Sequence, residues 1–469
     1  MRKRMPAARA VLFCVSAGRG GKLEQLFYQA RPQDRGLGAS KSENLTAERA
    51  LAGRPEEFLK RALKRLYEKR NPAKRHGRNA RGKGRGATPV LRRLCALAAV
   101  CMMAAVSFRA AGAEEIDISA CAAILIDAAS GRVLYAQNAD TRYPMASTTK
   151  IMTALLALEN SAPDEIVTAS ERAAGTGGTS IYLSAGETLS MEEMLKGLML
   201  RSGNDAAVAI AEHIGGSVEN FAAMMNARAE ELGADARFVT PNGLDAEGHG
   251  ASARAMALIA REALRRDDFR ALVGAQRAVI PWRDNQYNRV LTNKNRLLRD
   301  YEGATGVKTG FTKKAGRCLV FSAERDGMEL IGVVLGCGAW FDEAERLLDW
   351  GFENFSLACA AERGEDCGTV AVAGGASPRV RVIAESGAAA AVRASDQWSI
   401  ELTLARLVAA PVHAGDGLGR AALKVNGEII AETRLIAAES SERLTFWDIF
   451  VKVLGGWPLG ALFVEPIAR

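Results

Sequence analysis

Residues 144–159 read PMASTTKIMTALLALE, and they decide how the rest of the chain is interpreted. Apolar residues recur at helical spacing behind Ser147 and Lys150, so this stretch predicts a helix that begins at these two residues. Side chains three positions apart on a helix are neighbours, so the amine of Lys150 can reach the hydroxyl of Ser147. A serine in the first helical turn also lies at the positive end of the helix dipole. The pair is therefore a candidate nucleophile with a candidate base beside it.

A lysine acts as a base only when it is unprotonated, and the ordinary pKa of its amine is about 10.4. The site must therefore lower the pKa of Lys150, by burial or by a second cation nearby. The S-x-x-K pattern alone does not establish such a site, because it also occurs by chance at the start of many surface helices. Other residues have to complete the chemistry.

Two later stretches offer the groups that a serine–lysine pair would need. Residues 201–205, RSGND, interrupt two apolar helices and carry the hydroxyl of Ser202 and the amide of Asn204. Residues 308–310 form the K-T-G triplet of GVKTGFT, directly before a pair of predicted strands. Alone, the first is usually a loop and the second a turn. In this order, behind an S-x-x-K motif, they indicate a single catalytic site.

Hydrophobic patterns predict strands at both ends of this region. Residues 122–140 read as two apolar strands around an Ala-Ser-Gly turn, and residues 317–336 read as a hairpin around Asp326-Gly327. Between them, a capping-box pattern at Ser190 opens a helix that runs to Arg201. Strands that enclose helices predict an α/β fold of the α+β kind, in which an antiparallel sheet is covered by helices. Further helices are expected at residues 206–214, 217–232, 252–264 and 342–352.

Beyond residue 365 the sequence changes to short β-like segments separated by Gly-rich turns, such as TVAVAG, RVRVIAES and ALKVNGEIIAET. Asn426-Gly427 is the strongest hairpin turn among them, because these residue types accept a positive φ. Residues 365–440 therefore predict a small all-β domain, separate from the domain at residues 114–360. No catalytic constellation of residues occurs in the small domain.

The last segment, residues 441–469, contains the aromatic and apolar run LTFWDIFVKVLGGWPLGALFV. As a helix it is amphipathic, and Pro458 would kink a helix that spanned a membrane. Such a helix suits the surface of a membrane, and the alternative is a helix packed on the small β domain. The apolar face consists of Phe446, Trp447, Phe450, Leu454 and Trp457, and the polar face of Thr445, Asp448 and Lys452.

Residues 92–113, RRLCALAAVCMMAAVSFRAAGA, have the layout of a secretory signal peptide. Two arginines precede an apolar run that is shorter than the roughly 20 residues of a membrane span. Small residues follow this run, as at a cleavage site. The alternative is a short transmembrane helix or a buried helix. We expect export to the outer face of the cytoplasmic membrane, after which the chain would begin near Glu114.

Residues 1–91 precede this signal and form a basic, low-complexity extension. Residues 1–93 carry 25 Lys and Arg against 7 Asp and Glu, so the net charge of +8 becomes −10 for the rest of the chain. Either the true start codon lies further downstream and the extension is not made, or the extension is a basic cytoplasmic segment that binds nucleic acid. For the exported protein itself we expect no nucleic-acid partner.

Eight cysteines occur, and five of them lie after residue 113. This odd number, without a CxxC pair, argues against a disulfide framework or a zinc site. We expect buried free thiols, with Cys359 and Cys367 as the only plausible local bridge. The four histidines do not cluster with the cysteines, so neither a metal nor another cofactor is expected.

Together, the three motifs resemble those of the serine penicillin-binding proteins. More narrowly, the chain resembles the low-molecular-mass D-alanyl-D-alanine carboxypeptidases, the S11 type of peptidase. The resemblance covers residues 116–440 and includes YPMASTTKIMTALLALE, MLKGLMLRSGNDAAVAIAEHI, PNGLD, GVKTGFT and AGRCLVFSA. It implies a β-lactamase-like catalytic domain, a small β-rich domain and a C-terminal helix that anchors the protein at a membrane.

The resemblance also implies which residues act on the substrate. Ser147 would attack the carbonyl between the two terminal D-alanines of a peptidoglycan stem peptide, and Lys150 would take its proton. Ser202 would relay a proton towards the departing D-alanine. Water would then hydrolyse the acyl-enzyme. β-Lactams would acylate the same serine and remain attached to it.

Five further residues are implied in substrate binding. Asn204 would hold the substrate amide, and Thr309 would meet the terminal carboxylate. Lys308 would supply the positive charge that keeps the base neutral. Gly310 completes the triplet, and the backbone N–H of Phe311 would form an oxyanion hole with that of the nucleophile.

Some features depart from the family pattern and keep two alternatives open. Many members carry an arginine near the start of the helix after the last core strand, where this chain has Trp340, with Arg346 further along. A class A β-lactamase would share the motifs but needs a deacylating glutamate, and no Glu-x-x-Leu-Asn motif follows residue 113. A peptidoglycan-binding protein without catalytic activity would keep only the pocket.

Overall fold

The computed structural model describes residues 116–282 and 285–455 of the 469-residue chain. The extension and the signal peptide expected in residues 1–113 lie outside this described part. All described residues belong to the unit Phe108–Arg469, one of the two into which the chain divides.

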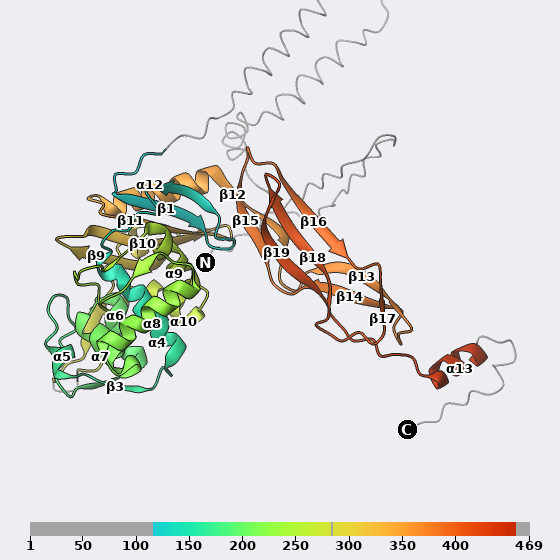
Figure 1. The fold of residues 1–469 in the computed structure, drawn as a ribbon, viewed down its shortest axis with the longest axis horizontal. Coiled ribbons are helices and arrows are strands. Elements are labelled where there is room, and N and C mark those ends of the chain that lie inside the picture. The colour runs from blue at the N-terminus through green and yellow to red at the C-terminus, as the bar shows by residue number, and fades with distance from the viewer. Residues whose placement is uncertain (1–115, 283–284, 456–469) are drawn as a thin grey trace, which may run out of the picture. The chain divides into compact units, whose positions relative to one another are not determined.

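A five-stranded antiparallel sheet lies at the centre of the first half of this unit (Figure 1). The strand order is β2-β1-β11-β10-β9, so the first strands in the chain pair with the last strands of the domain. Both predicted hairpins are confirmed. Asp326 and Gly327 have φ values of 52° and 79°, which a tight two-residue hairpin turn requires. The strands are β1 (Ala122–Asp127), β2 (Val133–Gln137), β9 (Ala304–Thr312), β10 (Gly316–Arg325) and β11 (Met328–Leu335).

Helices cover both faces of this sheet, which confirms the predicted α+β class (Figure 1). Side chains alternate between the two faces along each strand. Ile124 therefore packs with Leu155 in one core, and Leu125 packs with Leu347 of α12 (Trp340–Asn354) in the other. The helices on the face opposite α12 are α4 (Lys150–Asn160), α6 (Met191–Leu200), α7 (Asn204–Gly215), α8 (Val218–Glu231), α9 (Ala253–Leu264) and α10 (Asp267–Gly274).

Local signals in the sequence set several of these boundaries. The capping box is confirmed: the hydroxyl of Ser190 accepts from the backbone of Glu193, whose carboxylate accepts from the backbone of Ser190. Helix α7 begins two residues earlier than predicted and ends before Gly216, which has a φ of 69°. Shorter elements complete this half: η1 (Ala146–Thr149), α5 (Glu171–Ala174), α11 (Leu297–Asp300), and the strand pairs β3 (Ile166–Thr168) with β4 (Thr188–Ser190), β5 (Ala236–Arg237) with β6 (Gly250–Ala251), and β7 (Arg277–Ile280) with β8 (Arg289–Thr292).

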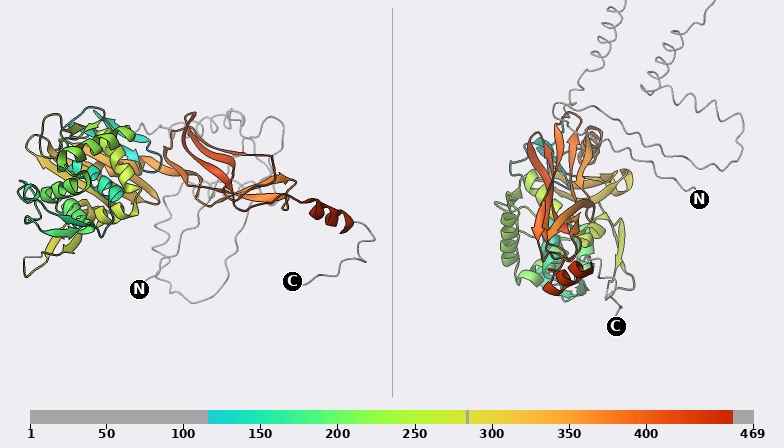
Figure 2. Two further views of the ribbon diagram at one scale, coloured as in Figure 1. Left: turned by 60° about the horizontal axis from the view of Figure 1, so that its bottom comes forward. Right: turned by 90° about the vertical axis from the view of Figure 1, so that its right-hand side faces the viewer.

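The strands after α12, drawn orange to red, form sheets without intervening helices (Figure 2). A six-stranded sheet has the order β16-β18-β19-β14-β13-β17, and β12 pairs with β15. Asn426 and Gly427 have φ values of 52° and 90°, so the predicted hairpin turn is confirmed. The strands are β12 (Phe355–Ala361), β13 (Asp366–Ala373), β14 (Arg379–Ala384), β15 (Ala388–Arg393), β16 (Trp398–Leu404), β17 (Leu407–Ala409), β18 (Gly417–Val425) and β19 (Glu428–Ala437).

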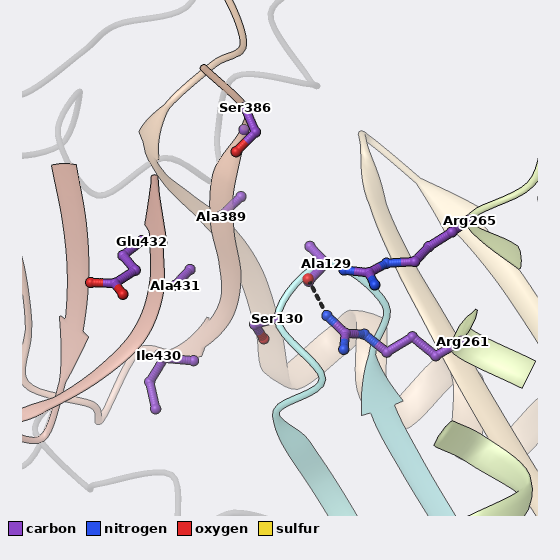
Figure 3. Close-up of a pocket in the computed structure, with 10 residues that line it drawn as sticks. Ala129, Ser130, Arg261, Arg265, Ser386, Ala389, Ile430, Ala431 and Glu432 are labelled. Atoms are coloured by element: carbon purple, nitrogen blue, oxygen red, sulfur yellow. Dashed lines mark hydrogen bonds between the residues drawn. The ribbon is translucent and has the colours of Figure 1, made fainter. Parts of the chain in front are cut away.

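Side chains of the β1–β2 turn bind the backbone of β15 on both sides of one residue. Arg132 donates to the carbonyl of Ala391 at 2.7 Å, and the Asp127 carboxylate accepts from the N–H of Ala391 at 3.2 Å. A hollow of about 430 Å³ lies beside this junction, lined among others by Arg261 and Glu432 (Figure 3). None of the residues predicted to act on substrate lines this hollow.

The cysteines follow the expectation only in part. Cys318 and Cys337 are buried free thiols, but Cys121 and Cys359 are exposed, so burial was wrongly predicted for these two. Cys367 carries a free thiol, so the local bridge that was considered for it is not formed.

The predicted amphipathic tail forms a helix, α13 (Phe446–Gly455). Phe446 and Trp447 are 72% and 68% exposed. The alternative prediction, a helix packed on the β domain, is therefore wrong. Trp457 and Pro458 lie outside the described residues. Among the described residues, no helix combines the length and the apolar composition that a membrane span requires.

Candidate active site

Ser147 lies in the 3-10 turn η1, directly before α4, rather than in the first turn of the α-helix itself. Two threonines stabilise this tight turn: Thr148 donates to the carbonyl of Met145 at 2.6 Å, and Thr149 donates to that of Ala146 at 2.8 Å. Ala146 has a φ of 49°, which is uncommon for a residue with a side chain. The backbone is therefore held in an unusual form at the residue before Ser147.

The amine of Lys150 lies 3.0 Å from the hydroxyl oxygen of Ser147, as the S-x-x-K spacing predicts. It also donates to the side-chain oxygen of Asn204 at 2.7 Å and to the backbone carbonyl of Asn242 at 2.6 Å. Two of these three partners are fixed acceptors. They orient the amine so that, once neutral, its lone pair faces the serine hydroxyl.

Burial and neighbouring cations lower the pKa of Lys150 well below its ordinary value. The Lys150 side chain is fully buried, and desolvation is the largest cause. The positive charges of Lys308 and Lys294 add to it, while Asp205 opposes them. A lysine with a lowered pKa is neutral at a lower pH, so it can serve as a base there.

Lys308 is itself desolvated, and burial with the charge of Lys294 lowers its pKa to about 7. Its amine donates to the carbonyl of Thr309 at 2.9 Å. Lys294 is exposed, and its amine lies 3.4 Å from the hydroxyl of Thr179. Sequence reasoning anticipated the effect of Lys308 but missed Lys294, because a single lysine in a loop carries no pattern.

Ser202 and Asn204 lie at the junction of α6 and α7, and both are buried. Ser202 has a φ of 64°. The structure joins Asn204 to the serine–lysine pair through Lys150. Within the described residues, the Ser202 hydroxyl makes no hydrogen bond to Ser147 or Lys150. Asn204 is therefore hydrogen-bonded to the serine–lysine pair, whereas Ser202 is not.

The K-T-G triplet lies on β9, which is an edge strand of the five-stranded sheet. A Cβ atom on Gly310 would lie 2.9 Å from the backbone nitrogen of Ser147 and 3.0 Å from that of Thr148. Glycine at this position therefore allows the strand to approach the nucleophile closely. The next residue, Phe311, is 62% exposed beside the site.

His249 stabilises the serine turn η1 through hydrogen bonds and does not act as an acid or a base. Its Nδ1 accepts from the backbone of Val239 at 3.0 Å, and its Nε2 lies 3.0 Å from the hydroxyl of Thr149. Because Nδ1 accepts, Nε2 carries the proton and donates to Thr149. Burial lowers the pKa of His249 to about 4, so the ring is neutral at physiological pH.

The residues discussed as substitutes for the family arginine lie within the packing of α12. The ring of Trp340 is 4.8 Å from that of Phe341, and it packs against the core on the α12 face. Arg346 donates to Glu343 at 2.8 Å. Lys294, and not Arg346, is the further cation whose charge lowers the pKa of Lys150 and of Lys308.

Comparison with known proteins agrees with this geometry over both halves of the described chain. Residues 109–339 match the family model of the D-alanyl-D-alanine carboxypeptidases, Peptidase_S11. Residues 355–443 match the model of the penicillin-binding protein 5 C-terminal domain. The first match contains all three motifs.

Curated relatives extend the similarity over nearly their whole length. The D-alanyl-D-alanine carboxypeptidase DacF of Bacillus subtilis is 34% identical over 357 residues, which cover 73% of this chain and 91% of that protein. DacC of Escherichia coli is 35% identical over 369 residues, covering 73% and 90%. The crystal structure of penicillin-binding protein 5 from Haemophilus influenzae aligns with a TM-score of 0.58 at 30% identity, over 71% of this chain and 100% of that one.

Proposed function

Because the chain belongs to the D-alanyl-D-alanine carboxypeptidase family of peptidases, we propose that it removes the terminal D-alanine from peptidoglycan stem pentapeptides through an acyl-enzyme on Ser147. The observation that carries this proposal is the buried amine of Lys150, 3.0 Å from the hydroxyl oxygen of Ser147. The lowered pKa of Lys150 supports its role as the base.

Acylation begins when the oxygen of Ser147 attacks the carbonyl carbon between the two terminal D-alanines. The hydroxyl proton passes to the neutral amine of Lys150. The tetrahedral intermediate collapses with cleavage of the carbon–nitrogen bond, and the departing D-alanine takes up a proton that Ser202 relays. Water then attacks the ester, and its proton returns through the same base, which restores the free enzyme.

The oxyanion of the tetrahedral intermediate is held by the backbone N–H groups of Ser147 and Phe311. The close approach of Gly310 to the backbone of Ser147 supports this role, because it brings the two segments together. Each such donor is worth on the order of 3 kcal/mol in the transition state.

The remaining motif residues bind the substrate. Asn204 holds the substrate amide with its side chain, and Thr309 meets the terminal carboxylate. Lys308 adds positive charge that favours the carboxylate and keeps Lys150 neutral. A substrate backbone that pairs beside β9 would extend the sheet, since β9 is the end strand in its order. β-Lactams would acylate Ser147 in the same way.

We also propose that the protein acts outside the cytoplasm, at the membrane surface. The signal-peptide pattern of residues 92–113 supports export. The exposed Phe446, Trp447 and Phe450 of α13 support contact with the membrane interface.

Release of free D-alanine from diacetyl-L-Lys-D-Ala-D-Ala tests the proposed reaction. We expect steady release by the exported protein and none by Ser147→Ala, with Lys196→Ala, at a partly exposed lysine outside the site, as a control that keeps the activity. Rapid turnover of penicillin without D-alanine release would instead indicate a β-lactamase. Binding of the peptide without either product would indicate a protein that has lost its catalytic activity.

A further inference from the structure

Asn204 is oriented by a neighbouring segment that none of the three motifs contains. Its side-chain amide donates to the carbonyl of Gly177 at 2.8 Å, and its backbone donates to that of Thr179 at 2.7 Å. These bonds leave the side-chain oxygen of Asn204 facing Lys150. The position of residues 177–179 therefore decides how Asn204 meets the base.

The turn that follows, Ser180–Leu183, is held by a buried carboxylate on one side. Asp205 accepts from the hydroxyl of Ser180 at 2.5 Å, from the backbone of Ile181 at 3.0 Å and from that of Leu183 at 3.1 Å. Tyr182, between them, has a φ of 63° and is 70% exposed. Asp205 thus satisfies the N–H groups of a turn that has an unfavourable backbone.

A buried cation holds the same turn on the other side. Arg289 of β8 donates from Nε to the carbonyl of Ile181 at 2.7 Å and from Nη2 to that of Tyr182 at 2.8 Å. It also donates to the carbonyl of Pro281 at 2.8 Å. With two further bonds to Glu187, all five N–H groups of the guanidinium have acceptors.

Glu187 compensates the charge of this arginine. Its two oxygens accept from Nη1 and Nη2 of Arg289 at 2.6 and 2.8 Å, and one also accepts from the backbone of Ser184 at 3.0 Å. The two side chains are only 4% and 2% exposed. A buried pair of this kind is weak evidence for a contribution to stability, because desolvation offsets the attraction. The planar guanidinium of Arg289 holds its hydrogen-bond partners in a fixed geometry, which suits a role in positioning.

We propose that the buried Arg289–Glu187 pair is a positioning device for the active site. Within the turn Ser180–Leu183, the arginine of the pair fixes two carbonyl groups, and Asp205 fixes two N–H groups. The turn in this way holds the preceding residues against Asn204, and Asn204 against Lys150. This inference rests on the proposed function, because Asn204 and Lys150 matter here as parts of the acylation site.

Loosening the pair has a consequence that a loss of stability alone would not produce. A displaced turn lets the Asn204 amide rotate away from Lys150 and lets water reach the amine. Since desolvation is the largest cause of the lowered pKa of Lys150, access of water raises this pKa towards its ordinary value. The acid limb of the acylation rate then moves to higher pH.

The substitution Arg289→Lys tests the proposal, because lysine keeps the charge but lacks the planar fork. The matched control is Arg270→Lys, which removes the fork of a second arginine paired with both oxygens of Glu329. We would measure acylation by a fluorescent penicillin between pH 5 and pH 9, together with the melting temperature. We expect Arg289→Lys to slow acylation about tenfold or more at pH 7 and to shift the acid limb upwards. Arg270→Lys should change neither.

An unchanged acylation rate and acid limb in folded Arg289→Lys, with only a lower melting temperature, would overturn the proposal. Glu187→Gln keeps the shape of the carboxylate and serves as a second variant if Arg289→Lys does not fold; the same shift is expected from it. Wild-type protein that resists acylation by penicillin would contradict the proposed function instead, so the two failures are distinguishable.

Discussion

At the scale of single residues, the site depends on amines that the fold keeps out of water. Lys150 and Lys308 are both buried, and burial is the largest cause of the lowered pKa of each. In that environment a protonated lysine lowers the free energy of unfolding, yet the proposed reaction places both amines there, Lys150 as the neutral base and Lys308 as a neighbouring positive charge. Catalytic competence and stability are therefore opposed at these two positions.

The substitution Lys308→Met should make this opposition measurable. With a pKa of about 7 in the folded protein and 10.5 as the ordinary value, the unfolded chain binds more protons between these pH values, so stability rises with pH across this window. At pH 7 the buried lysine costs on the order of 4 kcal/mol. Lys308→Met should raise the free energy of unfolding at pH 7 and flatten its rise up to pH 10, while acylation is lost. Denaturant unfolding at several pH values measures this.

The outcome that would contradict this expectation is a variant that is less stable at pH 7 and shows the wild-type rise with pH. Lys196→Met provides the comparison, because Lys196 is a partly exposed lysine paired with Glu192. Its loss should not raise the free energy of unfolding at pH 7.

Lys294 offers a second test at this scale. Its charge lowers the pKa of Lys150 and of Lys308. Removing a neighbouring cation raises the pKa of Lys150, so Lys294→Met should shift the acid limb of acylation to higher pH and slow acylation several-fold at pH 6. The rate of penicillin acylation as a function of pH checks this. If the acid limb stays in place, Lys294 does not act on the base.

At the scale of elements, the serine turn depends on backbone that its own sequence does not reveal. Gly243, in the PNGLD stretch, has a φ of 80°, and a Cβ atom there would lie 2.0 Å from the carbonyl oxygen of Ala146. The close approach of this loop gives η1 its support and brings the carbonyl of Asn242 to Lys150. The pattern S-x-x-K predicts the pair, but not the loop that holds it.

Gly243→Ala should therefore disrupt the site, and Gly186→Ala is its matched control. Both glycines have a φ of 80°, but nothing lies within 4 Å of a Cβ atom on Gly186. The control should lose roughly 1 kcal/mol of stability from backbone strain and keep its acylation rate. Gly243→Ala should lose several kcal/mol more and acylate poorly. Equal losses of stability in the two variants, measured by denaturant unfolding, would argue against a tight contact at η1.

The difference between local signals and contacts between distant segments explains which features could be predicted from the sequence. Hairpins with Asp-Gly or Asn-Gly turns and the capping box at Ser190 are local signals, and all of them are present in the structure. The strands β12 and β15 were missed because FSLACAA and AAAAVR are rich in alanine, which has a low β propensity. Lys294 and Arg289 were missed because their partners are distant in the chain, as the 108 residues between Arg289 and Ile181 illustrate.

At the scale of the whole molecule, the candidate active site and the exposed apolar helix lie in different halves of the described chain. The three motifs lie in the half built around the five-stranded sheet, and the half that follows consists of strands and α13. The apolar side chains of α13 are exposed, including Val451 at 61% and Val453 at 60%. Several exposed apolar side chains on one helix are typical of a segment that binds another surface.

Removal of residues 445–469 should abolish binding to vesicles of phosphatidylglycerol and phosphatidylcholine. The rate of penicillin acylation in solution should stay the same, because no motif residue lies in this segment. Co-sedimentation with the vesicles measures the first, and the acylation rate measures the second. Thr445→Ala is a matched control within the segment that should still bind. Full vesicle binding by the shortened protein would exclude the helix as the anchor.

The central claim is that Ser147 becomes the nucleophile because Lys150 is held neutral beside it. Mass spectrometry of the exported protein after incubation with ampicillin tests this most directly. We predict the added mass of one ampicillin on the peptide that carries Ser147, and no addition in Ser147→Ala or Lys150→Met. An adduct on a different peptide, or an equally fast adduct in Lys150→Met, would contradict the claim.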